Sequence, residues 1–87
     1  MDFIKKENKI YLEDENHKII AEIEFEEIKD GIYNIYHTFV DDSLRGQGIA
    51  SKLVEEAVKY ISSKGFKVQA TCSYANAWLQ KHKKEDL

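Results

Sequence analysis

The sequence predicts an α+β fold, a mixed and mostly antiparallel sheet with one parallel strand–helix–strand crossover and a short C-terminal helix. Segments with strand-like alternation fill the first half of the chain. A strongly amphipathic helical pattern follows from residue 49, and another strand-like segment comes directly after it. Strands joined by a crossover helix pair in parallel with a right-handed connection, whereas segments joined by tight turns pair antiparallel.

The size and composition indicate one domain over residues 1–87. Apolar residues make up 43% of the chain, which is enough for a single modest core. The net charge of −3 argues against a general nucleic-acid binder. The basic run over 81–84 is interpreted as a solvated helix face.

The chain carries no pattern for export, disulfide formation or metal binding. Its N-terminal segment has no continuous apolar stretch, so we expect neither a signal peptide nor a membrane span. One Cys excludes an intramolecular disulfide framework, and three scattered His do not form a metal-binding motif. We therefore expect a cytoplasmic monomer without a metal, binding neither membrane nor nucleic acid.

The first three predicted strands are short segments joined by polar turns. Residues 4–7 and 9–12 are predicted to pair with each other. The segment 19–26 alternates apolar residues with glutamates, so one face is buried and the other is solvated. Asp30-Gly31 then predicts a type I′ hairpin, in which both central residues have positive φ.

The fourth predicted strand, Ile32–Val40, has the sequence IYNIYHTFV. It carries bulky or β-branched residues at both parities. A strand that is covered on both faces has this composition, so we place it centrally in the sheet.

The strongest pattern is a helix that begins near Gly48, with apolar residues recurring along one broad stripe. Gly65 supplies the left-handed cap that ends it. The segment 66–71 is predicted as the strand that pairs in parallel with the fourth one. A short helix from about Asn76 to His82 completes the chain.

The loop before this helix, Arg45-Gly46-Gln47-Gly48, suits an anion. The first N–H groups of a helix lack intrahelical partners, and the helix dipole is positive there. Gly46 and Gly48 lack the Cβ atoms that would keep a ligand away, and Arg45 adds a cation. This combination is typical of phosphate or pyrophosphate binding. A tight turn, in which the glycines serve only the backbone geometry, is the alternative.

Arg45-Gly46-Gln47-Gly48-Ile49-Ala50 resembles the acetyl-CoA loop of the GNAT-type N-acetyltransferases. HTFV at 37–40 and TCSY at 71–74 resemble the small stand-alone GNAT-like subgroup, and the resemblance covers roughly residues 10–74. The loop is shared by the whole superfamily, whereas the other two motifs are more particular to the subgroup. The resemblance implies a minimal GNAT-like fold and a single acetyl-CoA-binding domain.

The resemblance also implies the activity and how the co-substrate is held. Acetyl-CoA would donate an acetyl group to a primary amine, either of a small molecule or of a protein lysine, at an open and shallow acceptor site. Backbone groups of Phe39 and Val40 would pair with the pantetheine arm. The CoA pyrophosphate would bind to the loop amides of Arg45, Gly46, Gln47, Gly48, Ile49 and Ala50.

Transfer to an amine needs a base for the ammonium group and a proton for the departing thiolate. His37 and Cys72 are the catalytic candidates, because parallel pairing would make their strands neighbours. His37 shares parity with Ile35 in a regular strand, so a buried structural histidine is the alternative. Cys72 has three interpretations: a buried apolar residue, a residue that lines the cleft, and a nucleophile activated by His37.

The sequence departs from the wider family where the acid is expected. Many members place a Tyr on the helix after the last of these strands, whereas here Tyr74 lies early and Trp78 cannot donate a useful proton. Asn76 is a candidate contact for the pantetheine. A CoA-binding module with little catalysis is therefore the alternative function, and a purely structural domain is the third hypothesis.

Overall fold

A computed structural model describes residues 2–85, with the side chains of 83–85 outside the description, so only Lys81 and His82 of the basic run are described in full. Neither helix of this part is long and apolar enough to cross a membrane. The elements in chain order are β1 (Ile4–Lys6), β2 (Lys9–Glu13), β3 (Ile19–Lys29), β4 (Ile32–Val40), the 3₁₀ turn η1 (Asp42–Leu44), α1 (Ile49–Ser63), β5 (Lys67–Ala70) and α2 (Ser73–Glu85).

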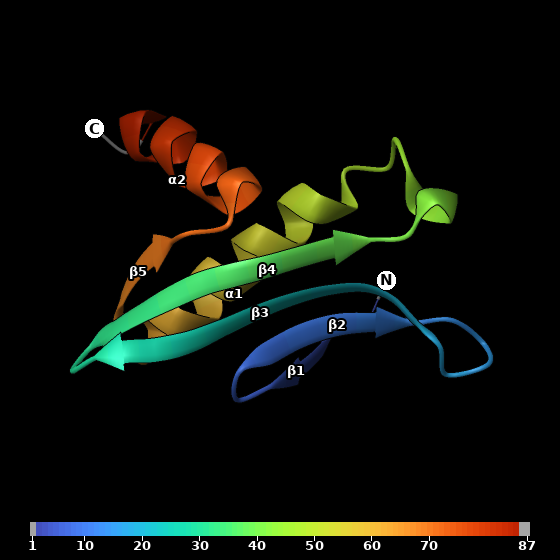
Figure 1. Cartoon of the computed structure of the whole chain (residues 1–87), viewed down its shortest axis with the longest axis horizontal. Helices are drawn as coiled ribbons and strands as arrows, with labels where there is room; N and C mark the ends of the chain where they lie inside the picture. Colours follow the sequence, from blue (N-terminus) through green and yellow to red (C-terminus); the bar gives the residue numbers. More distant parts are fainter. Residues whose placement is uncertain (1, 86–87) are drawn as a thin grey trace.

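The five strands form one sheet in the order β1-β2-β3-β4-β5. Neighbours pair antiparallel from β1 to β4, and β5 pairs with β4 in parallel after the chain has crossed the sheet through α1 (Figure 1). The predicted α+β class and its single parallel crossover are therefore confirmed.

The core lies between one face of the sheet and α1. Alternate residues of β2, β3 and β4 face the apolar stripe of α1, and Ala75 closes the core from α2. The face opposite α1 carries polar and partly exposed side chains. The largest fully buried side chains are Phe25, Ile10, Ile23, Ile35, Ile49, Leu53, Ile61 and Val54.

The coverage of β4 differs from the prediction. β4 lies between β3 and β5, as expected for a central strand. The face opposite α1 is covered at Asn34, which is buried, but not farther along, where Tyr36 and Phe39 are 43% and 39% exposed. The prediction that both faces are covered is therefore wrong for the second half of β4.

Two local predictions also need correction. The β3–β4 hairpin turns at Asp30-Gly31, but only Gly31 has a positive φ, of 80°, so the turn is not type I′. The last helix begins at Ser73, earlier than the predicted Asn76. It starts there because the carbonyl of Cys72 accepts the N–H of Asn76 at 2.9 Å and closes the first turn.

Candidate functional site

The loop after β4 turns the chain sharply into α1. The carboxylate of Asp41 caps η1 by accepting the N–H of Ser43 at 3.0 Å, and hydrogen bonding from the Ser43 hydroxyl and from this N–H lowers the pKa of Asp41. Gly46 and Gly48 follow with φ angles of 83° and 70°, in the left-handed region that other residues rarely adopt. Apart from the adjacent residues of the chain, no atom of the described residues lies within 4 Å of where a Cβ of either glycine would stand. The backbone thus requires glycine here, while the space beside it is open.

Gly48 is the N-cap of α1 and leaves the first turn without a side-chain cap. The first helical hydrogen bond runs from the N–H of Lys52 to the carbonyl of Gly48, at 3.2 Å. Among the described residues, none accepts a hydrogen bond from the N–H groups of Ile49, Ala50 or Ser51. Free donors at the positive end of a helix dipole form an anion-binding site.

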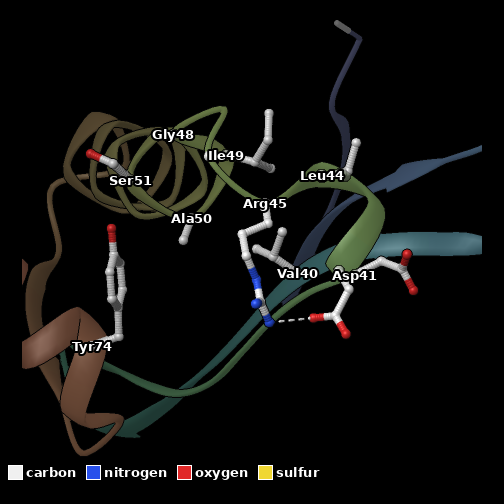
Figure 2. A pocket seen from close by; sticks show the side chains of 11 residues that line it. Val40, Asp41, Leu44, Arg45, Gly48, Ile49, Ala50, Ser51 and Tyr74 are labelled. Carbon is white, nitrogen blue, oxygen red and sulfur yellow. Dashed lines mark hydrogen bonds and ion pairs between the residues drawn. The ribbon is translucent and has the colours of Figure 1, made fainter.

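A shallow cleft of about 250 Å³ opens over this turn (Figure 2). Arg45 lies across it with its Nη2 atom 2.8 Å from Oδ1 of Asp42, and Tyr74 stands opposite with its hydroxyl directed toward α1. Gln47 does not line the cleft; its N–H donates to the carbonyl of Leu44 at 3.3 Å. The lining residues are Val40, Asp41, Asp42, Leu44, Arg45, Gly46, Gly48, Ile49, Ala50, Ser51 and Tyr74.

The two parallel strands, β4 and β5, separate beyond their last pair, Ile35 and Ala70 (Figure 1). β5 pairs with residues 32–35 only. The N–H groups of Thr71 and Cys72 then both donate to the carbonyl of Ile35, at 3.0 and 3.2 Å. Residues 37–40 of β4 pair with β3 on one side, and no described strand pairs with residues 36–40 on the other.

The open edge of β4 presents backbone groups. The N–H of Asp41 donates to the carbonyl of Ile20 in the direction of β3, at 2.8 Å. Successive residues of an antiparallel strand point their N–H and carbonyl groups to alternate sides. The backbone groups of Thr38 and Val40 are therefore directed to the open edge, and those of Phe39 to β3.

A bulge at Tyr36 reverses the parity of β4. Glu24 pairs with His37, but Phe25 pairs with Ile35, which leaves Tyr36 without a partner. Ile35 therefore faces α1, while His37 faces away from it. The expectation that these two residues share a face is wrong for this reason.

His37 lies beside the glutamates of β3 on the face opposite α1. Its Nε2 atom is 3.3 Å from Oε2 of Glu22, and its side chain is 44% exposed. Glu22, Glu24 and His37 each offer a polar atom within 4.8 Å of the others. Desolvation and the charge of Glu24 raise the pKa of the neighbouring Tyr36 hydroxyl. This face therefore joins an imidazole to a negatively charged surface.

Cys72 lies on the α1 side, directly before α2. Its Sγ atom is 3.4 Å from Oγ1 of Thr38. Partial burial raises the pKa of the thiol, but hydrogen bonds from the Thr38 hydroxyl and from the N–H groups of Ala75 and Tyr74 outweigh it, so the pKa lies below its ordinary value. A partly exposed thiol with a lowered pKa at a helix N-terminus is typical of a reactive cysteine.

Replacing Thr38 with valine is expected to slow the alkylation of Cys72 by iodoacetamide at neutral pH. Valine cannot donate to the thiolate, so the pKa of the thiol rises and less thiolate is present. Losing one hydrogen bond worth about 0.5–1.5 kcal/mol lowers the thiolate fraction, and with it the alkylation rate, by about two- to tenfold. Mass spectrometry across a pH series measures the rate, with Thr71→Val as the control, and equal rates for Thr38→Val and the unaltered chain would contradict the assignment.

The structure does not bring the two catalytic candidates together. His37 and Cys72 lie on opposite faces of the sheet, so His37 is not placed to deprotonate the thiol. Asn76 is also away from the cleft, because its Nδ2 atom donates to the carbonyl of Ala70 at 3.0 Å and it lines a separate hollow between α2 and β5. The Phe39 side chain lies on the face of His37.

Sequence reasoning missed two contributors, Tyr74 and Glu22. Tyr74 was placed before a helix that in fact begins at Ser73, and the extra turn carries it into the cleft. The sequence places Glu22 on the solvated, acidic face of its strand but does not place it beside His37. Its position beside His37 follows from the β3–β4 register, in which the bulge decides the pairing.

The profile of a known family, the GCN5-related N-acetyl-transferases, matches residues 9–87. Protein NATD1 from Gallus gallus is 34% identical over 62 residues, which cover 71% of this chain and 53% of that protein. The human NATD1 protein is also 34% identical over the same length. The chain therefore spans about half the length of the curated relatives that it matches.

Solved structures show the same fold. The solution structure of a GCN5-like candidate N-acetyltransferase from Staphylococcus aureus superposes with a TM-score of 0.78 and 33% identity, covering 98% of this chain and 83% of that one. A candidate streptothricin acetyltransferase from Bacillus anthracis, solved with acetyl coenzyme A, has a TM-score of 0.59 and 20% identity over 77% of this chain and 40% of that one.

Proposed function

Because the chain belongs to the GCN5-related N-acetyl-transferase family, we propose that it binds acetyl-CoA over the first turn of α1 and transfers the acetyl group to a primary amine. The uncapped start of α1 carries the proposal: Gly48 offers no side chain, and the N–H groups of 49–51 have no acceptor among the described residues. A pyrophosphate would accept hydrogen bonds from these groups, and Arg45 adds a positive charge beside it. A structure of the same fold that holds acetyl coenzyme A supports this choice of co-substrate.

The open edge of β4 would receive the pantetheine arm. Val40 lines the pyrophosphate cleft and also belongs to the segment 36–40, whose edge away from β3 is unpaired. The arm can therefore pass from the cleft to this open edge. Amide groups of the arm would pair with the backbone of Thr38 and Val40 as an added strand does. The thioester would then lie at the end of β5, close to Cys72.

The acceptor amine would approach from the face opposite α1. A thioester at the strand edge can be reached from both faces, and His37 lies on the open one with Glu22 3.3 Å from its ring. The glutamates attract the cationic ammonium group, and His37 accepts the proton that must leave before the nitrogen attacks. The nitrogen then bonds to the carbonyl carbon, the C–S bond breaks, and the second proton that the nitrogen loses passes through solvent to the departing CoA thiolate.

Cys72 offers a second route on the other face. Its thiolate, stabilised at the start of α2, would attack the carbonyl carbon and release CoA thiolate, leaving an S-acetyl group on Cys72. Intact-mass analysis after incubation with acetyl-CoA distinguishes the routes. An added acetyl group that is absent from Cys72→Ser supports the covalent route, whereas an unmodified chain during turnover supports direct transfer.

The decisive experiment is acetyl-CoA turnover across small amines and lysine peptides, followed by release of free thiol. His37→Gln is expected to lower kcat at neutral pH by about a hundredfold or more, the usual contribution of a general base, and less at high pH where the amine is already free. His17→Gln, at an exposed turn, is the matched control. Full activity in His37→Gln would remove this residue from the mechanism.

A CoA-binding module with little catalysis is the second candidate. The separation of His37 from Cys72 favours it, because the two catalytic candidates cannot act as a pair. CoA-induced shifts of the Gly46–Ala50 amide resonances without turnover of any amine would support the module. No shifts at millimolar CoA would leave only a structural role for the glycines.

Asp42→Asn is expected to strengthen CoA binding. The Asp42 carboxylate is 2.8 Å from the Arg45 guanidinium and so competes with the pyrophosphate for it. Both side chains are highly exposed, so the gain is limited to about fivefold, from ~0.2–1 kcal/mol for an exposed ion pair. Isothermal titration calorimetry should show the gain shrinking at high salt. The same gain in an Arg45→Gln background would contradict competition for Arg45.

A further inference from the structure

Thr71 is the first residue of the chain beyond the last pair of the two parallel strands, Ile35 and Ala70. Ala70 belongs to the core and so faces α1. Because successive side chains of a strand point to opposite faces of the sheet, Thr71 points away from α1, and it is exposed. The Thr71 hydroxyl therefore lies at the end of β5, on the face from which the acceptor amine would approach.

A buried amide determines how this hydroxyl is used. Asn34 is 7% exposed, and its Oδ1 atom accepts a hydrogen bond from Nε2 of Gln69 at 3.4 Å. Its Nδ2 atom donates to Oγ1 of Thr71 at 3.0 Å. A threonine hydroxyl has one donor and two acceptor sites, so the bond from Asn34 occupies an acceptor site and leaves the O–H able to donate. Among the residues that the structure describes, none accepts this O–H.

The structural role of this pair does not account for the outward O–H. The bond between Asn34 and Thr71 joins β4 to the chain beyond β5, and it needs only the threonine oxygen. The N–H groups of Thr71 and Cys72 are both taken by the carbonyl of Ile35. The hydroxyl is therefore a hydrogen-bond donor that the fold leaves unused at the point where the two strands separate.

We propose that the Thr71 hydroxyl donates a hydrogen bond to the CoA sulfur as the thiolate departs. The inference rests on the proposed function, since it needs the thioester to lie at the end of β5. A thioester sulfur is a poor acceptor and a thiolate is a strong one, so this bond forms as the C–S bond breaks. A threonine hydroxyl is a much weaker acid than a thiol. Thr71 therefore keeps its own proton, and the proton that the thiolate finally takes comes from solvent.

Thr71→Val removes the donor with little change of shape. It is expected to lower kcat for amine acetylation about ten- to hundredfold, the effect of one hydrogen bond to a charged group. The affinity for acetyl-CoA, measured by calorimetry, should not change, because the bond is absent from the ground state. Thr71→Ser keeps the O–H and should keep most of the activity. An unchanged kcat in Thr71→Val would overturn the proposal, and so would an equal loss in Thr71→Ser.

The thiol of bound CoA provides a second readout that needs no acceptor amine. A donor to the thiolate lowers the pKa of the thiol, so Thr71→Val should raise the pKa of the bound CoA thiol by about 1–2 relative to Thr71→Ser. The ultraviolet absorbance of the thiolate measures it, with the free chain as the baseline. Both variants are made in a Cys72→Ser background, which removes the single Cys of the chain. A purely structural threonine would give equal pKa values, and that result would overturn the contact.

These outcomes separate the inference from the proposed function. Absence of CoA binding would remove both. Amine acetylation in which Thr71→Val changes neither kcat nor the pKa of the bound thiol would leave the proposed function standing and overturn only the role of Thr71. A raised thiol pKa in Thr71→Val without turnover of any amine would support the contact with the sulfur and favour the CoA-binding module.

Discussion

Gly48→Asp is expected to weaken acetyl-CoA binding about ten- to hundredfold, because like charges brought together cost several kcal/mol and each 1.4 kcal/mol is tenfold in affinity. Gly48 is the N-cap of α1 at φ 70°, directly beside the free N–H groups of the first turn. A carboxylate at this position would repel the pyrophosphate and compete for the same donors. The affinity is measured by isothermal titration calorimetry.

Gly48→Asn is the matched control for this change. Asn and Asp have nearly the same shape, both tolerate the left-handed conformation better than other residues, and the space around the new side chain is open. The two variants should therefore have similar folding stability and differ in charge alone. If Asn weakened binding as much as Asp, the loss would come from the backbone and the anion site would be refuted.

Phe25→Ala is expected to lower the free energy of unfolding by about 3–5 kcal/mol, out of the ~5–15 kcal/mol typical of a domain. Phe25 is 0% exposed at the centre of β3. Its ring contacts Tyr33 and Tyr60, with centroids 6.2 and 6.0 Å away. Alanine would leave a cavity where β3, β4 and α1 meet. Urea or guanidinium unfolding measures the loss.

Phe39→Ala supplies the comparison for the core substitution. Phe39 is 39% exposed on the opposite face of the sheet, so the same change there should cost much less, about 1 kcal/mol or below. Similar losses for the two variants would mean that the described face opposite α1 is buried in solution by something else.

The regular elements were predictable because their patterns are local. The alternation in β3 and the stripe of α1 each report which face is buried, and the glycines mark both ends of α1. The segment 32–40 was harder because bulky or β-branched residues occupy both parities. The bulge adds one residue, Tyr36, and so moves every later side chain of β4 to the other face of the sheet. No local feature of the sequence indicates this bulge.

The part of the candidate site that is formed by the backbone was predictable. The part that requires side chains from two different strands to come together was not. Positive φ at Gly46 and Gly48 is a strong constraint, so the motif predicted the tight turn into α1 that the structure shows, and anion binding at this turn is a proposal. The expected approach of His37 to Cys72 assumed a regular β4 and was reversed by the bulge. The position of Asn76 on its helix could not be predicted, because the start of α2 depends on the hydrogen bond by which the Cys72 carbonyl closes the first turn.

The divergence of β4 from β5 also affects the solution behaviour of the ligand-free chain. Residues 36–40, YHTFV, expose one row of unsatisfied amides and carbonyls and contain no proline or lysine, the usual guards against intermolecular strand pairing. At high protein concentration we expect this strand edge to favour self-association. A bound pantetheine would occupy it, so the co-substrate would act as a solubilising agent as well as a reactant.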